Sequence, residues 1–216
     1  MVAGEGPFRG SALLWALALE AARHDNGLLT ARSLRDVDAA RVAALFRIET
    51  ETVPDPERRA ALLRDVAHRL ERDHRGEAQA LLDAAGGSLG GEDGLLELLA
   101  SYEAYSDPLR KKSYLFAKIC ERRGWLSVSD PGHWEVCADN VLMRLALRSG
   151  LVAPGPLDEV RAATCAALKD VAERSGVPPP VLDVLLWELG RDDRDLLGTE
   201  GGDLREPPRD PDSAWY

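Results

Sequence analysis

The sequence predicts an all-α protein, folded as a single compact multi-helix domain over residues 1–216. Three observations predict this fold class. Alanine, leucine, arginine and glutamate dominate the chain, and only 6% of its residues are aromatic, a balance that favours helices over sheets. Capping residues followed by apolar runs mark successive helix starts. No two segments resemble paired strands, and no internal repeat is visible. At 216 residues the chain can bury one good core but not two independent ones.

The first third of the chain contains four helix signals. Ser11 caps a helix over 12–23, and Ser33 or Asp36 starts a second that ends near Phe46. Residues 47–54 are expected to be extended, because β-branched residues cluster before a proline. Proline at the first helical position then favours a helix over 56–73, followed by one over 77–85.

The remaining helices follow a glycine-rich segment, residues 86–91. We expect this segment to be a tight loop; a phosphate-binding loop is the weaker alternative, because no Lys-Ser/Thr follows it. Further helices are expected over residues 92–104, 107–123, 140–148, 157–175 and 179–190. The domain would comprise an N-terminal helical lobe, 1–105, a catalytic-type lobe, 106–197, and an irregular tail, 198–216.

Composition limits the possible partners and cofactors. The net charge of −10 argues against tight binding to duplex DNA, which requires clustered Lys and Arg. Three cysteines and four histidines show no metal-ligand spacing, so we expect no metal and no other cofactor. The N-terminus lacks an apolar signal core, and the longest apolar run, 12–19, is too short to span a bilayer. These features predict a soluble, cytoplasmic protein without membrane contact.

The candidate site is built around Asp139, which stands before an apolar helix. An aspartate there most often only caps the helix. A carboxylate can also stabilise the oxocarbenium-like sugar that forms when an N-glycosidic bond breaks. We expect Asp139 to stay ionised, because the helix dipole favours the anion. Downstream, Asp183 and Trp187 share a helical face, where the indole can stack on a base and the carboxylate can bind its edge. The alternatives are a helix cap for Asp183 and a core position for Trp187.

Lys111 and Lys112 are the candidate amines of this site. Either could donate hydrogen bonds to a base or sugar, and an amine of lowered pKa could attack the anomeric carbon. The alternative is that both lie in a solvated first helical turn. Lys111 is spaced to share a face with Leu115 and Ile119, which we expect to be buried, and Lys112 shares a face with Phe116. This spacing favours Lys111 weakly.

These residues carry a resemblance to the helix-hairpin-helix DNA glycosylases. The segments RKKSYLFAKICERRGW, CADNVLMRLALRSGLV and VAERSGVPPPVLDVLLWELGR are similar to the second half of archaeal 8-oxoguanine DNA glycosylases. That family has a catalytic lysine, a catalytic aspartate before a helix, and Leu-Asp-x-x-x-Trp to hold the base. The resemblance implies these roles for Lys111 or Lys112, Asp139, Asp183 and Trp187.

A second resemblance, to the queuosine salvage proteins, covers more of the chain. These queuosine 5′-phosphate N-glycosylases have segments similar to LLWALALEAA, ALFRIETETVPDPERRAALLRDVAHRLERDHRG and LLELLASYEAYSDP, before a Lys-Arg helix and an Ala-Asp helix start. Trp15 and Phe46 lie in the first two segments and join the base-binding candidates. The family's Phe-Ala-Asp-Tyr-Arg-Val-Pro is here Cys-Ala-Asp-Asn-Val-Leu-Met, which leaves the substrate open.

The sequence therefore predicts a hydrolase that releases a modified deazapurine such as queuine from queuosine 5′-phosphate. A DNA glycosylase or lyase acting on oxidised purine is the alternative. The Leu-Pro-Gly-Val-Gly hairpin that grips DNA phosphate is absent, which favours a free nucleotide over duplex DNA. A non-catalytic helical protein that binds nucleobases is the third hypothesis.

Overall fold

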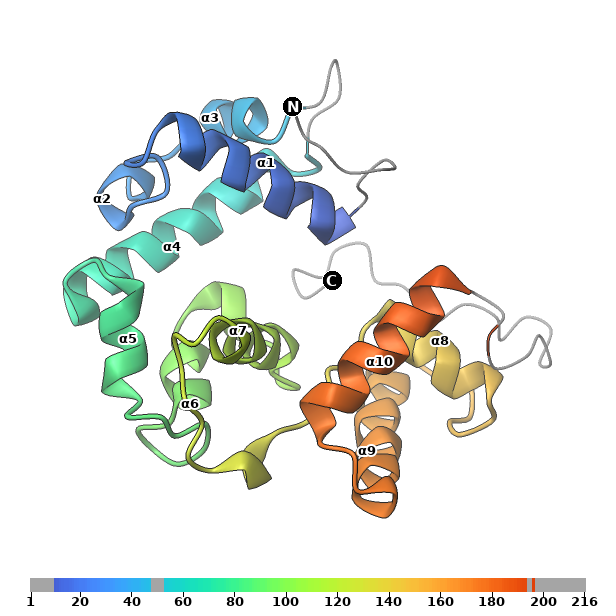
Figure 1. Ribbon diagram of the computed structural model, residues 1–216. Coiled ribbons are helices and arrows are strands. Elements are labelled where there is room, and N and C mark those ends of the chain that lie inside the picture. Colours follow the sequence, from blue (N-terminus) through green and yellow to red (C-terminus); the bar gives the residue numbers. More distant parts are fainter. Residues whose placement is uncertain (1–9, 48–52, 194–195, 197–216) are drawn as a thin grey trace. The chain divides into compact units, whose positions relative to one another are not determined.

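The all-α prediction is confirmed by the computed structural model, which describes residues 10–47, 53–193 and 196. Within these residues it contains ten α-helices and two short 3₁₀ helices, and no β-strand (Figure 1). The expected extended segment 47–54 lies mostly outside the described residues, and the expected tail 198–216 lies wholly outside them. None of the described helices is long and apolar enough to cross a membrane.

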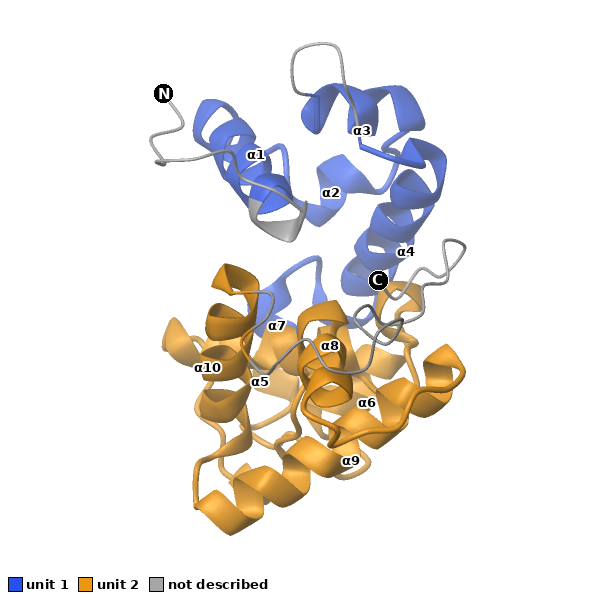
Figure 2. Cartoon of the chain, turned by 90° about the vertical axis from the view of Figure 1, so that its right-hand side faces the viewer, with its two compact units in different colours: residues 1–81 blue, residues 82–216 orange. Residues whose placement is uncertain are grey.

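The chain divides into two compact units, Met1–Leu81 and Leu82–Tyr216 (Figure 2). The expected lobes divide instead after residue 105. The difference arises because α6 and the following 3₁₀ helix pack against α7 and so belong to the second unit. All of α7–α10, which carry the candidate lysines, Asp139, Asp183 and Trp187, lie in that unit.

In the first unit two short helices pack on the longest one, and a further helix packs against one of these two. Its helices are α1 (Gly10–His24), α2 (Ala31–Leu34), α3 (Ala39–Leu45) and α4 (Pro56–His74). The side chains of Val37, Val42 and Ala60 form its buried core. α4 begins as expected, with proline at its first position and the Asp55 carboxylate accepting from the Arg58 N–H at 3.1 Å.

The helix expected up to Phe46 does not start at Ser33, because the segment contains two helices; the alternative start, Asp36, lies two residues before the observed cap Asp38. Thr30 Oγ1 accepts from the Ser33 N–H at 3.3 Å and caps α2, and the Asp38 carboxylate accepts from the Arg41 N–H at 2.7 Å and caps α3. Each cap provides an acceptor for an N–H group that has no partner inside its helix. The cap at Asp38 therefore allows a new helix to begin at Ala39.

The second unit contains α6 (Leu95–Ala100), α7 (Lys111–Arg122), α8 (Asn140–Arg148), α9 (Leu157–Ser175) and α10 (Pro179–Asp192), and α5 (Ala78–Ala84) spans the boundary. α8, α9 and α10 pack against one another. Gly190 allows the close approach of α10 to α8, since a Cβ there would lie 2.8 Å from Val141 Cγ1. The predictions for these three helices are confirmed to within two residues at each end.

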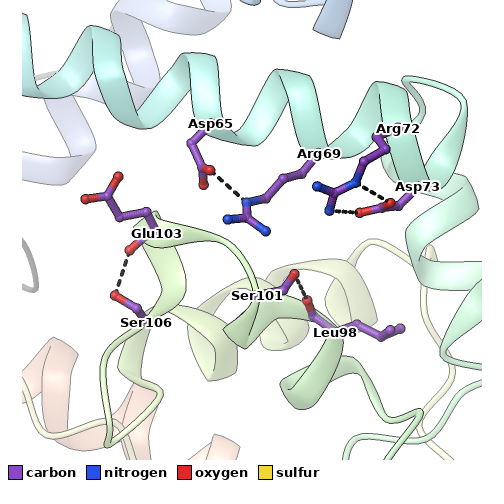
Figure 3. Close-up of polar contacts among 8 residues, drawn as sticks. All are labelled: Asp65, Arg69, Arg72, Asp73, Leu98, Ser101, Glu103 and Ser106. Carbon is purple, nitrogen blue, oxygen red and sulfur yellow. Dashed lines mark hydrogen bonds and ion pairs between the residues drawn. The ribbon is translucent and has the colours of Figure 1, made fainter.

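The helix expected over 92–104 is shorter than predicted. Gly94 precedes α6, and a 3₁₀ turn, Glu103–Tyr105, follows it. Serine hydroxyls bind backbone carbonyls where both elements end: Ser101 Oγ donates to Leu98 O at 2.8 Å, and Ser106 Oγ donates to Glu103 O at 2.9 Å (Figure 3). Serine competes in this way with the helical hydrogen bonds of its neighbours.

Neighbouring charged side chains on α4 form ion pairs. Arg69 Nε donates to Asp65 at 2.7 Å, one helical turn away, and Arg72 makes two hydrogen bonds to the adjacent Asp73 (Figure 3). Pairs of this kind add only a few tenths of a kcal/mol, roughly 0.3–0.5 each for i,i+4 spacing.

The glycine-rich segment 86–91 is a loop held by a carboxylate. Asp130 accepts from the N–H groups of Leu89 at 2.7 Å and Gly90 at 3.0 Å, and its neighbour Ser129 donates its backbone N–H to Gly87 O at 2.9 Å. A phosphate would need the N–H groups that Asp130 already binds. The tight-loop expectation therefore describes this segment better than the phosphate-binding alternative.

Candidate functional site

Asp139 lies at the N-terminus of α8 with its carboxylate turned back over the helix end. One oxygen, Oδ1, accepts from the N–H groups of Val141 and Leu142, both at 2.9 Å. The backbone of Asp139 is extended, with φ −109° and ψ −178°, as is usual for a residue that caps a helix. The cap leaves the second oxygen, Oδ2, without a hydrogen bond from either of these two N–H groups.

The expectation that Asp139 stays ionised remains a prediction, but the helix N-terminus is not the dominant influence on its pKa. Burial raises the pKa of this carboxyl above its ordinary value. The hydrogen bonds from Leu142 and Val141 and the charge of Lys111 act in the opposite direction, while the nearby charge of Asp183 raises the pKa further. Desolvation of the anion therefore outweighs the cap and the dipole. A carboxyl that is crowded by protein yet still partly exposed is typical of a site that binds a ligand.

Lys111 is the first residue of α7, and its charge acts on Asp139. The premise on which the sequence favoured it is wrong, because Leu115 is 37% exposed and Ile119 is only partly buried. The buried face of α7 is formed instead by Tyr114, Ala117 and Lys118 among others. Lys112 lies in the same first turn and is also partly exposed, so burial does not distinguish the two lysines.

The site includes an amine that sequence reasoning missed, Lys118. Its side chain is 10% exposed, and Lys118 Nζ donates to Asp183 Oδ1 at 2.5 Å. Lys118 lies seven residues after Lys111, two helical turns along the same face of α7. A lysine inside the apolar run Leu115–Cys120 was the available signal, because an isolated lysine in such a run is rarely buried without an acidic partner.

Asp183 joins three parts of the second unit. It lies on α10, and its Oδ1 binds Lys118 on α7. Its Oδ2 accepts from the Cys137 N–H, two residues before Asp139, at 2.8 Å. Asp183 does not cap α10, whose first residue follows Pro178. Its role in binding a base edge stays a prediction, and a base would have to share oxygens that already accept two hydrogen bonds.

Cys137 is the thiol nearest to this ion pair, and it is poorly suited to act as a nucleophile. Burial, followed by the negative charge of Asp183, raises the pKa of Cys137 well above its ordinary value. The reactive form of cysteine is the thiolate, which these surroundings disfavour. All three cysteines of the chain are unpaired. The chemistry of the site therefore rests on carboxylates and amines.

Trp187 lies one turn after Asp183 on α10 and is partly buried. The Arg191 guanidinium carbon is 4.8 Å from the centroid of its ring, within the range of a cation–π contact. Arg191 thus covers part of the indole, and any base would have to stack beside or in place of this contact. The base-stacking role of Trp187 is compatible with this geometry and stays a prediction.

Trp15 and Phe46 lie in the first unit. Trp15 is 54% exposed on α1, while Phe46 ends α3 and packs against the core of Val42 and its neighbours. Phe46 thus has a structural role of its own. The expected role of Trp15 and Phe46 in base binding stays a prediction.

Two surface cavities of the second unit are lined by residues other than the predicted ones. The larger has a volume of about 880 Å³ and lies between the Arg110–Glu97 and Lys169–Glu135 ion pairs, with Tyr114 in its wall. Each of its Arg and Lys side chains is already neutralised by a carboxylate. The smaller cavity has a volume of about 320 Å³. The lining of both cavities lacks Lys111, Lys118, Asp139 and Asp183.

Among the described residues, no group of three or more His, Cys, Asp or Glu side chains is placed to hold a metal ion. Comparisons with known proteins do not identify a family: no family model matches the chain, and a search among curated proteins returns no significant match.

The charged residues nevertheless form a definable group. Asp139, Asp183, Lys111 and Lys118 come from α7, α8 and α10, and they interact through a hydrogen-bonded ion pair or through their charges. We call these four residues the carboxylate–lysine cluster. It combines a partly exposed carboxylate of raised pKa with two amines, the groups required to bind a polar ligand and stabilise a developing cation.

Proposed function

We propose that this protein is an N-glycosidase that hydrolyses the bond between a modified deazapurine base and its ribose. Queuosine 5′-phosphate, from which queuine would be released, is the substrate we favour. The observation that carries the proposal is the Asp139 carboxylate at the mouth of α8, where burial raises its pKa and the charge of Lys111 opposes that rise.

The reaction needs a negative charge beside the anomeric carbon. As the bond to the base breaks, positive charge develops on the sugar ring, and a desolvated carboxylate stabilises this charge more strongly than a hydrated one. Asp139 is fixed by the hydrogen bonds to Val141 and Leu142 through Oδ1. Oδ2 is then the oxygen proposed to face the sugar and to orient the attacking water.

The lysines have different roles in this proposal. Lys118 Nζ is held in a buried ion pair with Asp183, so we do not propose that it attacks the sugar. Lys111 is assigned a hydrogen bond to the departing base or to the ribose. Because Lys111 is assigned to hydrogen bonding, the bond is proposed to be cleaved by water and not through the covalent Schiff base that a lyase would need.

The charge of the chain supports a small substrate over duplex DNA. The net charge is −10, and several arginines of the second unit, such as Arg110 and Arg161, are paired with carboxylates. A protein that grips duplex DNA neutralises several phosphates with such side chains. A single nucleotide requires no extended basic surface.

A substrate panel tests the proposal. Purified protein is incubated with queuosine 5′-phosphate, with queuosine, and with a DNA duplex that contains 8-oxoguanine, and free base is measured by chromatography with mass detection. We expect release of queuine from the nucleotide and no strand nicking. Nicking of the duplex without base release from the nucleotide would support the DNA glycosylase alternative, and binding of queuine without any release would support a non-catalytic binding protein.

A further inference from the structure

The start of α7 is held by a buried ion pair that the proposed chemistry does not use. Asp107 and Arg161 have side chains that are 0% and 2% exposed, and Arg161 Nη2 lies 2.7 Å from Asp107 Oδ2. Arg161 is on α9, and Asp107 precedes α7 by four residues. The pair therefore joins the second turn of α9 to the segment that leads into α7.

The Asp107 carboxylate also binds the backbone just before and at the start of α7. Its Oδ1 accepts from the Leu109 N–H at 3.1 Å, and its Oδ2 accepts from the Lys111 N–H at 3.3 Å. Between them, Arg110 has a left-handed backbone with φ of +54°, which is uncommon for a residue other than glycine. Helix α7 therefore begins at Lys111 instead of continuing from residue 107 as the sequence predicts.

Stability alone does not explain why a charged pair is buried here. Taking two charges out of water is costly, and apolar residues of similar volume often stabilise a core equally well or better. Strained backbone at a fixed point is also more common where geometry serves a function. The residue that this arrangement fixes, Lys111, is the one whose charge acts on Asp139.

We propose that Asp107 and Arg161 are positioning residues that fix the start of α7, and with it Lys111, in the carboxylate–lysine cluster. The inference rests on the proposed function of that cluster and extends it by two residues. Neither residue would touch the substrate. Arg161 holds Asp107, Asp107 binds the Lys111 N–H, and the helix then directs the lysine side chain.

The test removes both charges of the pair and measures Asp139. In the Asp107→Asn/Arg161→Met variant no unpaired charge stays buried, and the asparagine oxygen can still accept from the backbone. Carboxyl resonances of the full-length protein are followed by NMR as pH is varied, and Asp139 is assigned by comparison with Asp139→Asn. Lys111→Met provides the reference for complete loss of the lysine charge.

We expect the pKa of Asp139 to rise in Lys111→Met and also in the double variant. Adding Lys111→Met to the double variant should cause no further rise. Arg161→Lys, measured alongside, should give a smaller rise. Asp158→Asn is the matched control, because Asp158 is the other carboxylate near Arg161, at 4.0 Å, but is 86% exposed. It should leave the titration unchanged.

Activity supplies the second measurement. If the wild type releases base, the double variant should lose kcat by about tenfold to a hundredfold, the range expected when a catalytic group is displaced by about 1 Å, and Asp158→Asn should lose nothing. An unchanged Asp139 titration in the folded double variant and in Arg161→Lys overturns the positioning role, whether or not the wild type is active. A wild type that releases no base while the titration shifts as expected overturns the proposed function alone.

Discussion

The ion pair between Lys118 and Asp183 provides the sharpest test of the site's architecture. Replacing Lys118 by methionine keeps the length of the side chain but leaves the buried Asp183 carboxylate without its charged partner. Removing one partner of a buried pair typically destabilises a protein by about 3–5 kcal/mol, because the remaining charge has lost its compensation. The exposed fractions of 10% and 6% place this pair in that class.

A second lysine–carboxylate pair with the same N–O distance provides a matched control. Lys169 Nζ also lies 2.5 Å from a carboxylate, that of Glu135, but these side chains are 42% and 29% exposed. Ion pairs that remain accessible to water contribute roughly 0–1 kcal/mol. Lys169→Met should therefore change the free energy of unfolding by about 1 kcal/mol or less, although its hydrogen bond is as short as that of Lys118.

Both variants are compared with the wild type by urea denaturation and by thermal unfolding. For a chain of this size, 1 kcal/mol corresponds to about 2–4 °C in Tm, so Lys118→Met should lower Tm by about 6–20 °C. In the Lys118→Met/Asp183→Asn variant the loss should be smaller than in Lys118→Met alone, because no buried charge is left. Equal, small losses in Lys118→Met and Lys169→Met would refute the burial of the Lys118–Asp183 pair.

Three further predictions concern the site. Lys111→Ala should reduce base release while Lys112→Ala leaves it nearly unchanged, because the charge of Lys111 acts on Asp139; equal effects in the same assay would remove the distinction. Burial raises the pKa of Asp139 above its ordinary value of 3.8, so the folded state binds this proton more tightly than the unfolded chain, and ionisation costs stability as pH rises through the folded pKa. Asp139→Asn should therefore be more stable than the wild type at pH 7 in urea denaturation, with the advantage lost below about pH 3.8, and a less stable variant at pH 7 would contradict the role of burial. Trp187→Ala should weaken queuine binding by calorimetry about tenfold to a hundredfold, the loss of a stacking contact of about 1–3 kcal/mol; normal binding with a lowered Tm would assign Trp187 to the core.

The sequence predicted those parts of the structure that local chemistry determines. Asp139 caps α8 as expected, because a capping carboxylate and the N–H groups it binds lie within three residues of one another. The bounds of α8 and α9 match their predictions because each helix begins at a strong local signal and ends before a glycine.

Contacts between distant residues explain what the sequence could not predict. Lys118 was missed because its partner, Asp183, is 65 residues away, and the start of α7 was misplaced because Asp107 is held by Arg161, 54 residues away. The effect of burial on the pKa of Asp139 was likewise not visible in the sequence. The hydrogen bonds that lower it are local, but the burial that raises it comes from the packing of the whole unit.

The most direct test of the central claim is the rate at which Asp139→Asn releases queuine from queuosine 5′-phosphate under single-turnover conditions. Asparagine keeps a capping oxygen for Val141 and Leu142 but lacks the negative charge required by the developing cation. Removing such a group typically raises the barrier by about 4 kcal/mol, so release should be roughly a thousandfold slower while queuine binding is retained. Release within about tenfold of the wild-type rate, less than 1.4 kcal/mol of barrier, would contradict the assignment of Asp139 to the reaction.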